Sequence, residues 1–149
     1  RQSTDGSAVS LDLYQKEILA LAKRGSTPER LDAPDASARV DNALCGDRVT
    51  IDVTVSDGKI TGLGHKVQGC ALCQATAGLL METAIGRRVE DVTAASEELS
   101  RYIGEEDDTV SLSWPQMAVF QPVRQFKTRL ECVRLPLTAL SRACAAADE

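Results

Sequence analysis

The 149-residue sequence lacks the features of several common classes of protein. Its 17 Lys and Arg against 22 Asp and Glu give a net charge of −5, the wrong sign for a protein that binds by neutralising phosphates. Nucleic acids and membrane surfaces are therefore not expected partners. No stretch approaches the roughly 18 apolar residues that a membrane span needs, and residues 1–10 lack the apolar core of a signal peptide. We expect a soluble, cytoplasmic protein.

Histidine and nucleophile motifs are also scarce. His65 is the single histidine, and no serine stands in a nucleophile-elbow sequence, so hydrolase chemistry has little support. His65 falls in a predicted strand, where a lone histidine is more often a surface or edge residue than a metal ligand. The glycines around Leu63 are not followed by Gly-Lys-Ser/Thr, and they do not predict a nucleotide loop.

Cysteine is the residue type that carries chemical information here. The five cysteines are an odd number, which does not suit a complete disulfide framework. A chain of this length forms a hydrophobic core without disulfides, and in a reducing cytosol metal or sulfur chemistry is the better default. The cysteines stand at Cys45, Cys70, Cys73, Cys132 and Cys144.

The pattern along the chain predicts one domain over residues 11–149. Residues 1–10 are polar and are interpreted as a flexible N-terminus or a cloning remnant. Apolar residues at steps of three and four predict a helix over 11–22 that ends at Gly25. The proline-containing stretch 26–38 has no sustained period and is expected to be an extended connector.

A small antiparallel sheet is predicted in the next third of the chain. Apolar and polar residues alternate over 49–55, which is the pattern of a strand with one buried face. A turn at 56–58 and weaker alternation over 59–67 predict a hairpin. A preceding strand at 39–43 would bring the sheet to about three strands.

Helical spacing dominates the rest of the sequence. It predicts a helix over 70–85, one or two short helices over 88–103, and a final helix over 123–140 that Pro136 kinks or restarts. Residues 104–108 are expected to form a solvated acidic loop. The whole predicts an α+β fold in which helices pack against a small antiparallel sheet.

Three cysteines stand where the chain changes structural state. Cys45 precedes a strand, Cys70 begins a helix, and Cys132 lies in or opens a helix. Thiolates suit a metal of intermediate softness, and Asp47 would add an oxygen ligand. Their spacing matches no generic zinc motif, so a shared metal site and a set of buried, inert cysteines both stay open.

Two features of this set bear on its chemistry. Carboxylate binds zinc or iron more weakly than thiolate does, so Asp47 is the ligand most easily exchanged. Cys70 and Cys73 form a C-x-x-C, which suggests a dithiol oxidoreductase as an alternative. That motif normally lies in a βαβ unit, whereas here a hairpin precedes it. We expect Cys73 to pack in the core and Cys144 to be inert.

Three motifs together resemble a known family. They are NALCGDR at 42–48, QGCA at 68–71 and RLECVRL at 129–135. In this order they resemble the U-type iron–sulfur cluster assembly scaffolds, the NifU N-terminal, IscU and SufU group, over about residues 14–140. The long interval before Cys132, with extra residues within 89–114, and the stretch 122–129 resemble the SufU branch. The Leu-Pro-Pro-Val-Lys segment of IscU-type scaffolds is absent.

The resemblance implies an IscU/SufU-like fold and a site for zinc or a [2Fe–2S] cluster at Cys45, Asp47, Cys70 and Cys132. It implies that Cys45 accepts persulfide sulfur from a PLP-dependent cysteine desulfurase and that iron–sulfur apoproteins or carrier proteins receive the product. Such a chain is a scaffold or sulfurtransferase rather than a classical turnover enzyme, and it is a monomer or weak homodimer. The alternative within the family is a zinc-dependent sulfurtransferase that activates the desulfurase and holds no cluster.

Two residues depart from the family pattern. Glu131 replaces the His or basic residue that precedes the third cysteine, and Cys73 is not part of the usual signature. Two readings outside the family also remain: the dithiol oxidoreductase, and a plain binding module whose cysteines are incidental.

Overall fold

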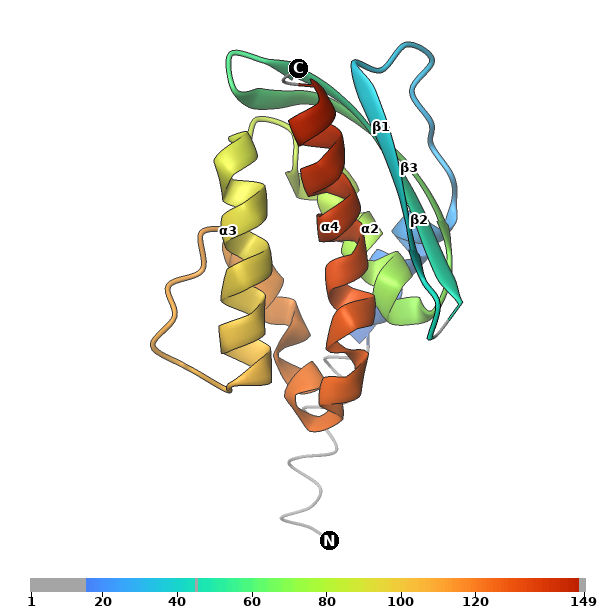
Figure 1. Ribbon diagram of the computed structural model, residues 1–149. Helices are drawn as coiled ribbons and strands as arrows, with labels where there is room; N and C mark the ends of the chain where they lie inside the picture. The colour runs from blue at the N-terminus through green and yellow to red at the C-terminus, as the bar shows by residue number, and fades with distance from the viewer. Residues whose placement is uncertain (1–15, 45, 148–149) are drawn as a thin grey trace, which may run out of the picture.

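The fold is described from a computed structural model that covers residues 16–44 and 46–147 (Figure 1). A first helix occupies 16–26. The later elements are β1 Ala36–Asn42, β2 Asp47–Ser56, β3 Lys59–Gln68, α2 Ala71–Thr83, α3 Val89–Leu99, a π-helical turn η1 Ser100–Gly104, a 3-10 helix η2 Pro115–Arg129 and α4 Leu130–Ala147. Within the described residues, no helix is long and apolar enough to cross a membrane.

The three strands form one antiparallel sheet in the order β1-β2-β3. Alternation on β2 places Val49, Ile51 and Val53 on a fully buried inner face. The hairpin between β2 and β3 turns at Asp57 and Gly58, both with positive φ, as a two-residue turn of this kind requires. The predicted sheet and turn are therefore confirmed.

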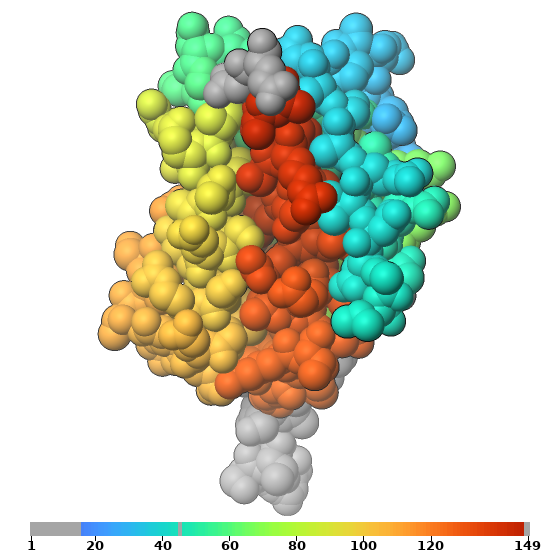
Figure 2. Space-filling view, viewed as in Figure 1, coloured from blue at the N-terminus to red at the C-terminus, as the bar shows by residue number. Residues whose placement is uncertain are grey.

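Helices cover the inner face of this sheet. α4 packs on β1 and β2, α2 packs on β3, and α3 packs on the far side of α4. Figure 1 shows α4 running between α3 and the sheet, and Figure 2 shows it lying between them along much of the molecule's length. The predicted α+β class is confirmed.

The first helix crosses α2 at two glycines. A Cβ at Gly25 would lie 2.0 Å from the Gln74 carbonyl oxygen, and one at Gly78 would lie 1.9 Å from the Leu21 carbonyl oxygen. Gly25 was predicted to end this helix, which instead continues through it to residue 26. The glycine serves close helix packing rather than a cap. The part of the predicted helix over 11–15 lies outside the described residues.

The C-terminal helices differ from the sequence expectation. The predicted helix over 123–140 is divided between η2 and α4, and η2 itself is interrupted at Phe126, which has φ −139° and ψ 58°. α4 continues through Pro136 without restarting and ends at Ala147. Buried contacts of Pro136 and the α4 residues around it sustain the helix despite the missing backbone donor.

The connector between the first helix and β1 crosses the outer face of the sheet (Figure 1). Glu29 exchanges backbone hydrogen bonds of 3.0 and 2.7 Å with His65 on β3, and the Leu31 amide then donates to Asp52 on β2. Gly64 permits this crossing, since a Cβ there would lie 2.7 Å from the Leu31 nitrogen. The connector therefore covers one half of the outer face and leaves the other half open.

His65 is buried, contrary to the expectation of a surface or edge residue. It lies opposite Ile51 on the inner face, and its Nε2 donates to the Gly25 carbonyl oxygen at 2.9 Å. Burial lowers the pKa of His65, and the Gly25 hydrogen bond opposes that shift. His65 thus holds the first helix to the sheet as a neutral side chain.

Candidate metal centre

Three of the predicted ligands meet where a strand and two helices begin. Asp47 is the first residue of β2, Cys70 is the N-cap of α2, and Cys132 lies in the first turn of α4. One ligand atom from each lies within 4.8 Å of the other two. The fold therefore assembles a carboxylate and two sulfurs that are distant in sequence.

Asp47 is fixed to the start of α2. Its Oδ1 accepts a hydrogen bond from the Cys70 amide at 3.1 Å, and its Oδ2 lies 3.5 Å from the Cys70 sulfur. A Cβ at Gly69 would lie 2.7 Å from the Asp47 carboxylate, so only glycine permits this approach. Asp47 and Cys132 are each 3% exposed, while Cys70 is half-buried. The site is thus shielded but reachable through Cys70.

Arg129 supplies positive charge to both sulfurs. It is the last residue of η2, and hydrogen bonds to Cys70 and Cys132 raise the pKa of its guanidinium. A fixed cation at this point attracts the negative charge that metal ligands or an incoming anionic sulfur would bring to the site. In the sequence, Arg129 is visible only as the first residue of the RLECVRL motif. Its position three residues before Cys132 was the available signal.

The β1–β2 turn adjoins the same site. The Asn42 side-chain oxygen accepts a hydrogen bond from the Leu44 amide, and the main-chain carbonyl of Asn42 accepts one from the Gly46 amide. Gly46 has a positive φ of 72°. A cavity of about 450 Å³ lies beside it and is lined by Asp41, Asn42, Ala43, Gly46, Asp47, Arg48 and Gln68. Cys45 lies outside the described residues, so its role as a ligand stays a prediction.

Glu131, Cys73 and Cys144 are not members of this donor group. Glu131 is turned towards solvent and pairs with Arg134 at 2.9 Å. Cys73 is fully buried in the hydrophobic core, and Cys144 is also buried there. The burial of Cys73 disfavours a Cys70–Cys73 dithiol oxidoreductase, which needs both sulfurs accessible to a substrate.

The chemistry of the donor set fits a metal ion. Two thiolates and one carboxylate provide ligands that zinc and iron both accept, and Arg129 balances the charge of the sulfurs. Three protein donors also leave room for a fourth ligand from Cys45, a partner or a substrate. This set can hold zinc or form part of an iron–sulfur site.

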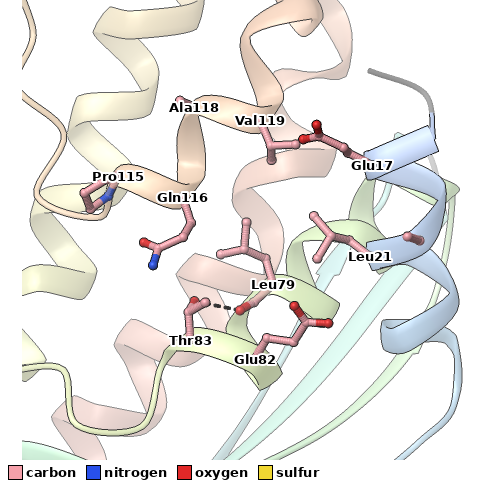
Figure 3. Close-up of a pocket in the computed structure, with 10 residues that line it drawn as sticks. Glu17, Leu21, Leu79, Glu82, Thr83, Pro115, Gln116, Ala118 and Val119 are labelled. Carbon is pink, nitrogen blue, oxygen red and sulfur yellow. Dashed lines mark hydrogen bonds between the residues drawn. The ribbon is translucent and has the colours of Figure 1, made fainter. Parts of the chain in front are cut away.

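A separate cavity of about 780 Å³ lies between the first helix, α2 and η2 (Figure 3). Its walls include Leu21, Leu79 and Val119, with carboxylates from Glu17 and Glu82. Among the described residues, no cysteine or histidine lines it. The candidate ligands around Asp47 are therefore not part of this cavity.

Several known proteins are similar to this chain in sequence and in fold. Residues 13–133 match the NifU-like N-terminal domain. An iron–sulfur cluster assembly scaffold protein IscU from Thermotoga maritima is 28% identical over 132 residues, which cover 88% of this chain and 92% of that protein. A nitrogen-fixing NifU-like protein (N-terminal) from Brucella abortus superposes with a TM-score of 0.80 at 31% identity, over 92% of this chain and 95% of that one.

A further neighbour bears on the fold alone. It is a putative iron–sulfur cluster assembly scaffold protein for the SUF system from Fervidobacterium islandicum AW-1, with a TM-score of 0.74 at 22% identity. The superposition covers 86% of this chain and 93% of that one.

Proposed function

We propose that this chain, which belongs to the NifU-like N-terminal domain family, is an iron–sulfur cluster biogenesis protein that accepts sulfur and supports cluster assembly at Cys45, Asp47, Cys70 and Cys132. The observation that carries the proposal is the meeting of Asp47, Cys70 and Cys132 at one point. The scaffold relative from T. maritima supports the same role.

The chain's own residues are suited to receive sulfur. In the proposed step, the Cys45 thiolate attacks the outer sulfur of a donor persulfide. A new S–S bond forms at Cys45, the donor's S–S bond breaks, and the donor cysteine leaves as a thiolate, so no outside oxidant is required. Arg129 keeps positive charge beside Cys70 and Cys132, the two sulfurs that would hold the growing cargo with Asp47.

A PLP-dependent cysteine desulfurase is the proposed donor. Leu44, directly before Cys45, is 99% exposed on the β1–β2 turn. A fully exposed leucine beside a reactive cysteine offers an apolar contact to a docking protein, and such contacts often dominate interface energetics. Iron–sulfur apoproteins or carrier proteins are the proposed recipients.

The experiment is transfer of ³⁵S from labelled cysteine through a cysteine desulfurase onto the purified chain. Label should appear on the wild type in a form released by a reducing thiol and should be lost in Cys45→Ser. Cys144→Ser is the matched control and should keep the label, because Cys144 is buried away from the site. Equal labelling of wild type and Cys45→Ser would reject Cys45 as the acceptor.

A zinc-dependent sulfurtransferase without a cluster is the second candidate. It is favoured by the compactness of the donor group, since one carboxylate oxygen and two sulfurs within 4.8 Å suit a single four-coordinate ion. When bound, zinc would supply charge that keeps its thiol ligands deprotonated. Cys70, Cys132 and Asp47 would hold it.

Asp47→Ala separates the two candidates. Removal of the most exchangeable ligand should lengthen the lifetime of a reconstituted cluster if the chain is a scaffold, because the entry point for incoming ligands is lost. A zinc sulfurtransferase should instead lose bound zinc and its stimulation of the desulfurase. Unchanged metal content and unchanged sulfur flow would reject the site itself.

A further inference from the structure

The open half of the outer sheet face is basic in an acidic protein. Arg39 on β1 lies opposite Thr50 on β2, and Thr50 lies opposite Lys66 on β3. Arg48 stands two residues before Thr50, so it shares the outer face. Arg30 comes from the connector at the border of this half. Four cations thus gather on one face of a chain with a net charge of −5.

These cations surround a small polar cavity of about 150 Å³. Its lining residues are Arg30, Arg39, Arg48, Thr50, Lys66 and Gln68, and none of them is apolar. A cavity of this size suits one small anion rather than a length of polypeptide. A protein interface would also need apolar or aromatic anchors, and this cavity has none.

Two of the cations are held in place by carboxylates. The Asp52 carboxylate accepts hydrogen bonds from Arg30 Nε at 2.7 Å and from Arg30 Nη2 at 2.9 Å. The Asp41 carboxylate accepts one from Arg48 Nε at 3.0 Å. Both guanidiniums keep further N–H donors for another acceptor. Orienting a guanidinium beforehand lowers the entropy cost of binding a ligand.

Positive charge remains after these pairs are counted. Arg39 reaches Asp41 only at 4.0 Å, and within residues 16–44 and 46–147 no ion pair involves Lys66. Four cations therefore face two carboxylates, Asp41 and Asp52. The Asp52 carboxylate is paired with Arg30, which offsets its negative charge towards an incoming anion.

We propose that this cavity, the oxyanion pocket, binds a small free oxyanion such as inorganic phosphate. The bound oxygens accept hydrogen bonds from the lining guanidiniums, the Lys66 ammonium and the Thr50 hydroxyl, and the anion compensates the local excess of positive charge. Arg48 and Gln68 also line the cavity beside Asp47. The oxyanion pocket therefore adjoins the candidate metal centre without using its ligands.

The test is a titration of the metal-free protein with sodium phosphate, followed by the backbone amide NMR signals of Thr50 and Lys66. Sodium chloride at equal ionic strength is the reference, since it reproduces screening alone. Phosphate should give saturable shifts that chloride does not. Lys66→Gln and Arg39→Gln should each weaken binding by about fivefold or more, the effect of one charge-assisted contact.

Arg142→Gln is the matched control, because Arg142 is an exposed cation near the C-terminal end of α4 and does not line the pocket. Its affinity for phosphate should stay at the wild-type value, and the spectra report the folding of every variant. Equal effects of phosphate and chloride, or full binding by Lys66→Gln, would overturn the proposal. Neither outcome would affect the proposed sulfur transfer, since no variant changes a proposed ligand.

Discussion

Two buried aspartates on β2 have opposite relations to their surroundings. Asp52 is fully buried and accepts hydrogen bonds from Arg30, the Leu31 amide and the Ser37 hydroxyl. Asp47 is 3% exposed and accepts a hydrogen bond from the Cys70 amide, with the Cys70 sulfur 3.5 Å from its other oxygen. One carboxylate is occupied by structural donors, and the other faces sulfur.

The difference separates a structural acid from a candidate ligand. Burial raises the pKa of Asp52, but hydrogen bonds from Arg30, Ser37 and Leu31 hold it below the usual value, so this group stays charged and fixes the connector to the sheet. Asp47 has coordination capacity left for a cation. Burial alone therefore does not mark the functional residue; the partners of the buried group do.

The largest expected effect comes from Gly69→Ala. The new Cβ would lie 2.7 Å from the Asp47 carboxylate and must displace it. We expect zinc affinity to fall by about tenfold to a hundredfold, as when the support of a metal ligand is lost. Competition with a chelating dye would measure it. Gly104→Ala is the control, because its Cβ would meet only the Leu130 side chain at 3.4 Å. Equal zinc affinity in both variants would contradict the account.

Asp52→Asn is expected to lower the stability of the fold and to leave metal binding unchanged. Loss of the charge weakens the contacts with Arg30 and Ser37, and we expect the free energy of unfolding to fall by about 2 kcal/mol, allowing for the half-exposed arginine. Metal content should not change. Urea denaturation and metal analysis of the same samples would check both points. A loss of metal without a loss of stability would reverse the assignments of the two aspartates.

Cys73→Ser tests whether Cys73 is a fourth sulfur ligand of the site. Burial of a hydroxyl in place of a fully buried thiol should lower the free energy of unfolding by about 1–2 kcal/mol. Metal per chain should equal that of the wild type. Loss of metal at unchanged stability would add Cys73 to the ligand set and would favour a role for the Cys70–Cys73 pair.

The smallest expected effect is a pH dependence of stability from His65. Its folded pKa lies below the usual value because the ring is buried, so its contribution is complete above about pH 6.5 and is lost as the pH falls. The slope reaches at most about 1.4 kcal/mol per pH unit. His65 is the single histidine, so His65→Gln should remove the slope between pH 7 and 5. Urea denaturation across this range would measure it, and an unchanged slope would contradict the assignment.

The sheet and the candidate ligands Asp47, Cys70 and Cys132 could be predicted from the sequence. Alternation over β2 predicted its buried face, and Asp57-Gly58 predicted the hairpin turn, because both signals are encoded in adjacent residues. Cys70 at a helix start was visible for the same reason.

Features that depend on tertiary packing were not predictable in this way. Gly25 resembles a helix stop, yet it is required for contact with α2. Arg129 is the first residue of a recognised motif, but its contact with two sulfurs from distant segments depends on the fold. His65 gave no sequence signal of its burial, which depends on the first helix folding over β3.

The central claim is that Asp47, Cys70 and Cys132 form a metal or cluster site. Its most direct test is zinc, iron and acid-labile sulfide per chain, measured on anaerobically purified wild type and Cys132→Ser. In the wild type, we predict either about one zinc per chain or equal amounts of iron and sulfide. In Cys132→Ser, most of the bound metal and sulfide should be lost. Absence of metal and sulfide from the wild type, or equal content in both proteins, would contradict the claim.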